Sequence, residues 1–168
     1  MSQTTIDAPE QAAQDAPKQA AQAPFDLDRF IPYLLTRITG RLGNSLAGAL
    51  RPLRMTNKQW RVLAVLSAED GRTISELCAY TAVDHSTLSR VVDRLVDEGQ
   101  VERVPSPDDA RSTQIKLTDR GRETFHALLP IAIAQANWAI SGIDQAELDQ
   151  VTATLRKMLN NIRVSPYP

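Results

Sequence analysis

Residues 73–118 read TISELCAYTAVDHSTLSRVVDRLVDEGQVERVPSPDDARSTQIKLT. The stretch predicts a helix, a short turn, a second helix and then two strands around a polar tip. Thr73 and Glu76 form a capping box at the start of the first helix. After a turn at residues 81–83, Asp84 has the right chemistry to cap the second helix. Gly99 provides a left-handed stop, so we expect this helix over about residues 85–98.

The second helix has one apolar stripe and one polar face. The residues predicted to be buried recur at helical spacing: Leu88, Val91, Val92, Leu95 and Val96. The opposite face is rich in hydroxyls near its N-terminus. A short helix turned into a second helix of this kind is how a helix-turn-helix enters the DNA major groove. Residues 101–104 and 114–117 suit strands, and the segment between them is rich in turn formers. A hairpin directly after the second helix is a wing.

At this point the chain resembles a known family. Asp109-Ala110-Arg111, followed by Ile115, Leu117-Thr118 and Gly121, matches the pattern D-x-R-x-x-x-[LI]-x-L-T-x-x-G of the MarR transcriptional regulators. Residues 85–95 are similar to the recognition helix of that family. The resemblance runs from about Phe30 to the C-terminus. It implies a mainly α fold with a small β-hairpin wing, in which a winged helix-turn-helix is joined to a helical dimerisation domain.

Three regions are expected along the chain. Residues 1–24 are rich in Ala, Gln and Pro and are predicted to be a disordered tail. The resemblance implies that residues 25–50 and 119–165 form a helical dimerisation region, and the C-terminal helices carry more apolar surface than a small winged domain needs. Residues 51–118 are the predicted DNA-binding domain. The first helix of the chain has an apolar residue at every fourth position: Phe30, Leu34, Ile38, Leu42, Leu46 and Leu50.

The charge is unevenly distributed. A net charge of −1 and a pI of about 6.1 argue weakly against a nucleic-acid binder. However, residues 29–68 hold seven basic side chains and no acidic one. Arg54, Lys58 and Arg61 are candidates for contacts with DNA phosphates. Arg37 and Arg41 are candidates for a cleft that binds an anionic ligand. A solvated basic face, with stems lying over apolar surface, is the third reading, and all three stay open.

Other classes of site are not expected. The single cysteine, Cys78, is predicted to be a small buried core residue, although a redox-sensing thiol is the alternative. The two histidines, His85 and His126, are far apart and do not have metal-ligand spacing, so no metal is expected. The sequence has no catalytic motif, phosphate loop or dinucleotide fingerprint, so neither an enzyme nor a cofactor is expected. It has no long apolar run, and one cysteine fits a reducing compartment, so a cytoplasmic location away from membranes is predicted.

The resemblance implies a homodimer that binds double-stranded, pseudo-palindromic DNA, as a repressor released by a small anionic aromatic or acyl-thioester ligand. A winged-helix module used only for protein contacts is a further alternative. The candidate DNA-binding residues are His85, Ser86, Thr87, Ser89, Arg90, Arg94, Asp109, Arg111 and Ser112. Of these, Arg90 is expected to read guanine in the major groove. Arg111, braced by Asp109, is expected to enter the minor groove. The candidate ligand-binding residues are Tyr33, Arg37, Arg41 and Trp60.

Overall fold

The computed structural model describes residues 25–107 and 112–163. The chain divides into two compact units. One contains residues up to 35 and from 142 onward, and the other contains residues 36–141. The predicted disordered tail and the tip of the predicted wing lie outside the described residues. Among the residues that are described, no helix is both long enough and apolar enough to cross a membrane.

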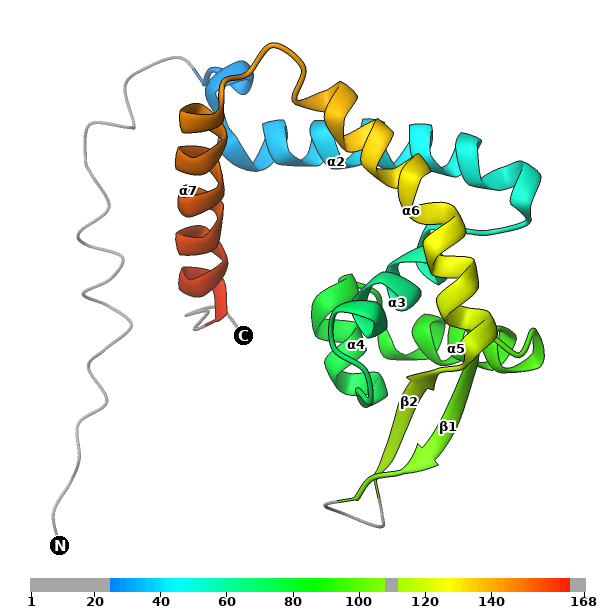
Figure 1. Ribbon diagram of the computed structural model, residues 1–168. Coiled ribbons are helices and arrows are strands. Elements are labelled where there is room, and N and C mark those ends of the chain that lie inside the picture. The colour runs from blue at the N-terminus through cyan, green and yellow to red at the C-terminus, as the bar shows by residue number, and fades with distance from the viewer. Residues whose placement is uncertain (1–24, 108–111, 164–168) are drawn as a thin grey trace, which may run out of the picture. The chain divides into compact units, whose positions relative to one another are not determined.

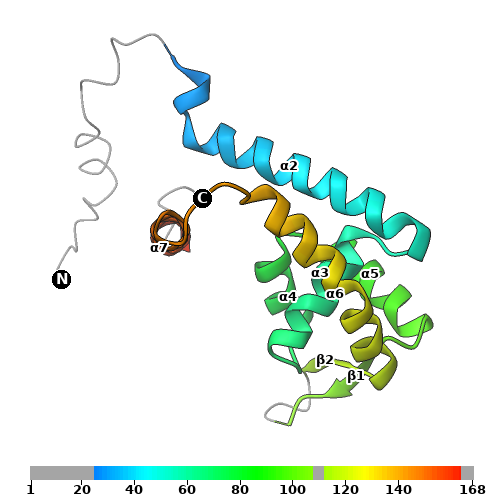
Figure 2. The ribbon, with the colours of Figure 1, turned by 45° about the horizontal axis from the view of Figure 1, so that its top comes forward.

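The larger unit is a winged helix-turn-helix (Figures 1 and 2). It holds most of α2 (Ile31–Leu50), the short 3-10 helix η3 (Arg51–Leu53), α3 (Asn57–Ala68), α4 (Ile74–Thr81), α5 (His85–Asp97), strands β1 (Val101–Pro105) and β2 (Thr113–Leu117), and α6 (Asp119–Ala139). Helices α3, α4 and α5 pack against one another, and the hairpin projects away from them. The predicted fold class, mainly α with a small β-hairpin wing, is therefore confirmed.

Helices α4 and α5, which form the helix-turn-helix, begin at the caps predicted from the sequence. The Thr73 hydroxyl accepts a hydrogen bond from the Glu76 amide, and the Glu76 carboxylate accepts one from the Thr73 amide, so the capping box is complete. Helix α4 ends at Ala82, which has a positive φ of 52°. Asp84 then caps α5 by accepting a hydrogen bond from the Thr87 amide at 2.9 Å. The turn between the two helices is thus only three residues long.

The wing is fixed at its base by neighbouring elements. Its strands pair antiparallel, from Val101 opposite Leu117 to Pro105 opposite Thr113. The Asp70 carboxylate, just after α3, accepts hydrogen bonds from the Leu117 amide at 2.9 Å and from Arg122 of α6 at 3.2 Å. Both strands are one residue longer than predicted, and Ile115 and Leu117 are buried.

The core of this unit lies between α3, α4, α5 and the hairpin. Its fully buried side chains include Leu63, Leu77, Leu88, Val92 and Leu95. Of the stripe predicted on α5, Val91 and Val96 are only half-buried. Burial of this apolar stripe orients α5, because its other face must then point outward.

A close backbone contact joins the core to α6. A Cβ atom added to Gly121 would lie 2.0 Å from the carbonyl oxygen of Gln100, so no larger residue fits without a shift of the chain. The same carbonyl accepts a hydrogen bond from the Thr118 amide at 3.1 Å, and the Thr118 hydroxyl donates to the carbonyl of Gly99 at 2.7 Å. This close contact explains why a glycine stands at position 121, the last position of the family pattern. Helix α6 continues through Pro130, which lies inside it.

The smaller unit is helical and exposes apolar side chains. It contains the 3-10 helix η2 (Leu27–Arg29), the first residues of α2 and α7 (Gln145–Arg163). Asp144 and Glu147 cap α7 by reciprocal hydrogen bonds. Four apolar side chains on α7 are exposed: Val151, Leu155, Leu159 and Ile162. The bounds of the two units differ from the predicted domain ranges. Those ranges concern DNA binding and dimerisation, and they stay a prediction.

Candidate functional site

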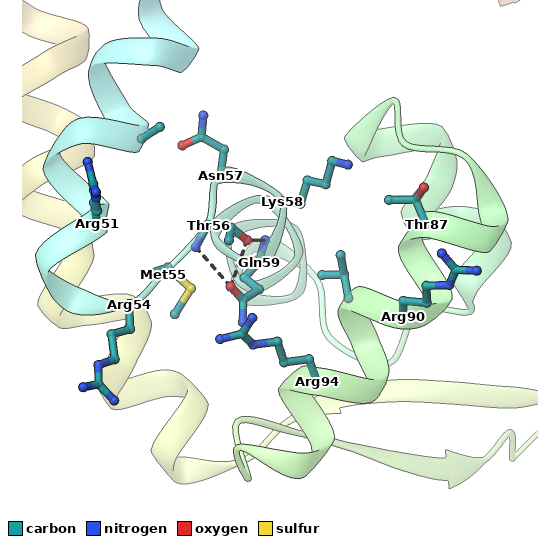
Figure 3. A pocket seen from close by; sticks show the side chains of 12 residues that line it. Arg51, Arg54, Met55, Thr56, Asn57, Lys58, Gln59, Thr87, Arg90 and Arg94 are labelled. Carbon is teal, nitrogen blue, oxygen red and sulfur yellow. Dashed lines mark hydrogen bonds between the residues drawn. The ribbon is translucent and has the colours of Figure 1, made fainter.

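A basic groove of about 800 Å³ crosses the outer surface of the larger unit (Figure 3). One wall comes from the end of α2, from η3 and from the start of α3, and the other wall comes from α5. Five of its lining residues are cationic: Arg51, Arg54, Lys58, Arg90 and Arg94. The remaining lining residues are uncharged, so the groove has a strongly positive surface.

The groove wall opposite α5 is positioned by a sharp turn in the backbone. Helix α2 ends in η3, where Pro52 stands near the start, and Arg54 follows in the left-handed region at φ 55°. The chain then enters α3 at Thr56, whose side chain forms a capping box with Gln59. Arg54, at this turn, and Lys58, in the first turn of α3, both line the groove together with residues of α5 (Figure 3).

The polar face of α5 supplies the other wall. Thr87, Arg90 and Arg94 line the groove at successive turns of the helix. Arg90 is exposed and has no ion-pair or hydrogen-bond partner among the residues that the structure describes. His85 and Ser86 are exposed at the start of the helix, and Ser89 is half-buried. The face predicted from the sequence to read DNA therefore points outward.

Asp84 organises the N-terminal end of α5. Its carboxylate accepts hydrogen bonds from the Thr87 amide and from the Ser86 hydroxyl at 2.8 Å. These bonds, the one from the Thr87 backbone first, hold the pKa of Asp84 well below its usual value. The carboxylate therefore stays ionised at neutral pH, and it orients the Ser86 hydroxyl at the start of α5.

A chain of polar contacts links the two walls of the groove. Gln59, which is almost fully buried, accepts hydrogen bonds from Thr56 and donates to Glu98 at 3.2 Å. Glu98 in turn accepts from Arg94 Nε at 2.8 Å. The sequence indicated Gln59 only as part of a helix cap. Its contact with Glu98 spans 39 positions and has no local signal.

The basic residues around α3 that the sequence suggests as phosphate contacts lie in two different surroundings. Arg54 and Lys58 lie on the groove, as a phosphate-contact role requires. Arg61 does not line the groove and instead donates to the Thr81 carbonyl at the end of α4, at 3.2 Å. Arg51, which is not among the predicted phosphate contacts, does line it. The sequence feature that could have indicated Arg51 is its place in a stretch with several basic residues and no acidic one, which continues through Lys58.

The predicted wing contacts are only partly described. Asp109 and Arg111 lie outside the described residues. Ser112 is half-buried at the start of the returning strand, and its carbonyl accepts a hydrogen bond from the Ser106 amide at 2.8 Å. This bond closes the hairpin between the last described residues on either side of the tip.

A second, smaller cavity of about 290 Å³ lies in the same unit, between α2, α3 and α6. Trp60 lines it and stacks on Phe125 with the ring centroids 5.3 Å apart. Arg61 is its cationic lining residue, and Gln135 and Asn57 are among the polar ones. Of the four candidate ligand residues, only Trp60 lines this cavity.

The other three ligand candidates are on α2. Arg37 and Arg41 are exposed and belong to the larger unit, whereas Tyr33 is half-buried and belongs to the smaller one. Cys78 is a free thiol that packs against the core, but it is half-buried rather than fully buried as the sequence predicts.

Comparisons with known proteins give a consistent result. The sequence profile of the MarR family matches residues 55–112. A crystal structure of a MarR family transcriptional regulator from Silicibacter pomeroyi is 38% identical, with a TM-score of 0.77, and the match covers 84% of this chain and 95% of that one. The transcriptional repressor IacR of Pseudomonas putida is 25% identical over 138 residues, which are 82% of this chain and 83% of IacR. The structure of CouR from Rhodococcus jostii RHA1 bound to p-coumaroyl-CoA is 25% identical, with a TM-score of 0.73, and covers 81% of this chain and 96% of that one.

Proposed function

The chain belongs to the MarR family of transcriptional regulators, and we propose that it acts as a homodimeric repressor that leaves its operator when a small anionic ligand binds. The observation that carries the DNA-binding part is the basic groove beside α5. Phosphate contacts supply most of the affinity of DNA-binding proteins, and they need cations placed along the path of the DNA backbone. The five cations of the groove meet that need.

In the proposed complex, α5 enters the major groove and the basic groove holds the adjacent phosphate backbone. Arg90 then reads a base edge, and guanine is its preferred partner because it offers two acceptors. Arg54, Lys58 and Arg94 contact phosphates. Arg51 is added to this set because it lines the same groove. The pattern residues Asp109 and Arg111 keep their proposed role at the wing tip.

The test is fluorescence anisotropy with duplexes tiled from the region upstream of the protein's own gene, at two or more salt concentrations. We expect tight binding to one pseudo-palindrome, with an affinity that falls steeply as salt rises. Arg90→Ala should weaken binding to this operator more than binding to random DNA. A loss of operator specificity of about 1–3 kcal/mol is expected for one bidentate base contact.

Arg120→Ala is the matched control, because it removes the same charge from an exposed residue of α6 that does not line the groove. It should leave operator binding within about twofold of the parent, as expected for a screened, distant charge. Equal losses for both variants would contradict the assignment of the reading face.

Dimerisation is supported by the exposed apolar stripe on α7. Val151, Leu155, Leu159 and Ile162 follow one another at helical spacing, and between 37% and 65% of each is exposed within one chain. An apolar stripe of this length indicates an interface. A two-fold dimer would place two α5 helices about one DNA turn apart, roughly 34–36 Å, which accounts for a pseudo-palindromic operator.

Sedimentation measurements on two α7 variants test the dimer. Leu159→Glu places a charge within the stripe and should convert the dimer to a monomer at micromolar concentration, with a large loss of operator affinity. Asn160→Glu adds the same charge to the neighbouring exposed position, outside the stripe, and should remain dimeric. A dimeric Leu159→Glu variant would place the interface elsewhere.

The effector site is proposed at the 290 Å³ cavity, which is near the lower end of the roughly 300–1,000 Å³ typical of ligand pockets. Trp60 offers an aromatic surface, and Arg61 offers a cation. An aromatic carboxylate fits this chemistry, and the volume suits the acid better than a whole acyl thioester. Arg61 also binds the end of α4, so a carboxylate that competes for its guanidinium would disturb the reading motif. Such competition gives the ligand different affinities for the two states, as a release mechanism requires.

Benzoates and cinnamates can be screened for release of the labelled operator. Arg61→Met should abolish the response to an active acid, whereas Arg37→Met should preserve it. Thermal unfolding of each variant controls for a general loss of stability. Loss of the response in Arg37→Met alone would move the site to the exposed arginines of α2.

A further inference from the structure

Glu98 is an acidic side chain directly beside the basic groove, and its position is specified by two partners. Its Oε1 accepts from Arg94 Nε at 2.8 Å, and its Oε2 accepts from Gln59 Nε2 at 3.2 Å. Gln59 is only 1% exposed, and its own oxygen accepts from the amide and the hydroxyl of Thr56. The Gln59 amide is therefore locked with its NH₂ group toward Glu98.

This arrangement needs a carboxylate at position 98. Two donors approach two different oxygens, so the side chain must offer two acceptors and no donor. A glutamine would offer one oxygen and one NH₂ group. Either Gln59 or Arg94 would then face a second donor, and one of the two hydrogen bonds would break. The two donors around position 98 therefore favour glutamate over glutamine, which has nearly the same shape.

Helix stability does not account for this choice. Arg94 and Glu98 form an exposed pair four positions apart, with 59% and 31% of their side chains accessible, and such pairs contribute little. The order, with the cation before the acid, is the weaker of the two orders. A carboxylate at the C-terminal end of α5 also lies near the negative end of the helix dipole.

The effect on Arg94 is more informative. A bond at Nε restrains the side chain and leaves the two terminal nitrogens of the guanidinium for another acceptor. Within the described part of the chain, those two nitrogens have no hydrogen-bond partner. Figure 3 shows the guanidinium of Arg94 at the groove, next to Gln59 and facing the wall that carries Arg54. This is the position from which it can bind a phosphate.

We propose that Glu98, held by Gln59, is a positioning residue that orients Arg94 for its contact with a DNA phosphate. The inference rests on the proposed function, because it assumes that the groove binds DNA. The contact is then made by an arginine whose side-chain rotamers are already restricted, so less conformational entropy is lost on binding. The negative charge of Glu98 beside the phosphate opposes this gain, so the charge effect and the positioning effect have opposite signs.

The opposite signs make a decisive experiment possible. The four proteins of a double-mutant cycle are the parent, Glu98→Gln, Arg94→Ala and the combined variant. Each is titrated onto a fluorescent duplex of mixed sequence over a series of salt concentrations, and its thermal unfolding is recorded. Asp97→Asn is the matched control, because it removes the same charge one position away, from an exposed residue that does not line the groove.

If Glu98 positions Arg94, Glu98→Gln weakens DNA binding roughly three- to tenfold in the parent, since part of the large rotamer freedom of arginine returns. It has no weakening effect when Arg94 is already alanine. Arg94→Ala lowers the slope of log affinity against log salt by about 0.9 for each phosphate that the protein no longer neutralises. Asp97→Asn binds slightly more tightly than the parent, because it removes only a repulsive charge.

Three other results would overturn the proposal. Tighter binding of Glu98→Gln in both backgrounds, as for Asp97→Asn, would make Glu98 a bystander charge. Equal weakening in both backgrounds, together with a lower Tm, would make its role only structural. If the parent shows no salt-dependent binding to any duplex, the proposed function itself fails, and the inference fails with it.

Discussion

Replacement of Gly121 by alanine tests how tightly the wing is joined to the helical part of the fold. The added Cβ would lie 2.0 Å from the Gln100 oxygen, 3.0 Å from its carbonyl carbon and 3.1 Å from Leu117 Cδ2. Non-bonded heavy atoms prefer separations of about 3.5–4.0 Å, so the Gln100 carbonyl must move by more than 1 Å, by roughly this measure. That carbonyl accepts from the Thr118 amide at 3.1 Å, and the shift breaks this bond.

The change in the free energy of unfolding follows from two destabilising effects and one stabilising effect. Overpacking of this kind costs about 1–3 kcal/mol. The broken hydrogen bond costs about 0.5–1.5 kcal/mol. Alanine recovers at most about 1 kcal/mol of helix propensity over glycine. We therefore expect a net destabilisation of about 2 kcal/mol, which lowers the Tm of a chain of this size by about 4–8 °C.

The assay is thermal and urea unfolding of Gly121→Ala, with Gly40→Ala as the control. Gly40 lies within α2, and an added Cβ there would meet no atom within 4 Å. The control should therefore be stabilised by up to about 1 kcal/mol. A Gly121→Ala variant as stable as the parent would refute the steric reasoning. It would mean that the junction between the wing and α6 yields easily.

Three further outcomes are expected. Because the folded-state pKa of Asp84 is depressed, its contribution to stability is present above its unfolded pKa of about 3.9 and is lost as pH falls below that value. Asp84→Asn keeps a good cap, and its Tm should fall less than that of the parent between pH 5 and about pH 2. Parallel curves of Tm against pH for the two proteins would contradict this. Asp70→Ala leaves the Leu117 amide without its acceptor and should cost about 1–2 kcal/mol, with faster hydrogen exchange at that amide, and unchanged exchange would count against this anchor. Hydrogen peroxide should not alter DNA binding by the parent or by Cys78→Ser, since a thiol packed against the core reacts slowly. A peroxide response that is present in the parent and lost in Cys78→Ser would favour the redox-sensing alternative.

The features that were predictable from the sequence are local ones. The capping boxes at Thr56 and Thr73 involve residues three positions apart, and each is read directly from the pattern. The outward face of α5 follows from the periodicity of its apolar stripe. The wing followed from turn chemistry and from two short alternating strands. In each case the interacting residues are close in sequence, so the physical cause is visible there.

The features that could not be predicted depend on contacts between distant residues. Arg61 donates to the Thr81 carbonyl 20 positions away, and no local pattern in the sequence indicates this contact. Gln59 joins Glu98 across 39 positions, and this contact makes a capping residue part of the groove wall. The left-handed turn at Arg54, which brings the start of α3 beside α5, has no glycine to indicate it. Sequence periodicity states which face of a helix is buried, but not which helix covers it.

The basic groove has a consequence for the rate at which the protein associates with DNA. The whole chain has a net charge of −1, so at long range it is almost neutral and DNA attracts it weakly. Within about 10 Å, the Debye length at 0.1 M salt, the five cations of the groove dominate the local field. In the proposed mode of DNA binding, encounters in other orientations dissociate quickly, whereas encounters that present the groove to DNA last long enough for α5 to reach the major groove. Added salt should slow this capture without changing the rate at which the molecules collide, so the association rate constant should itself depend on ionic strength.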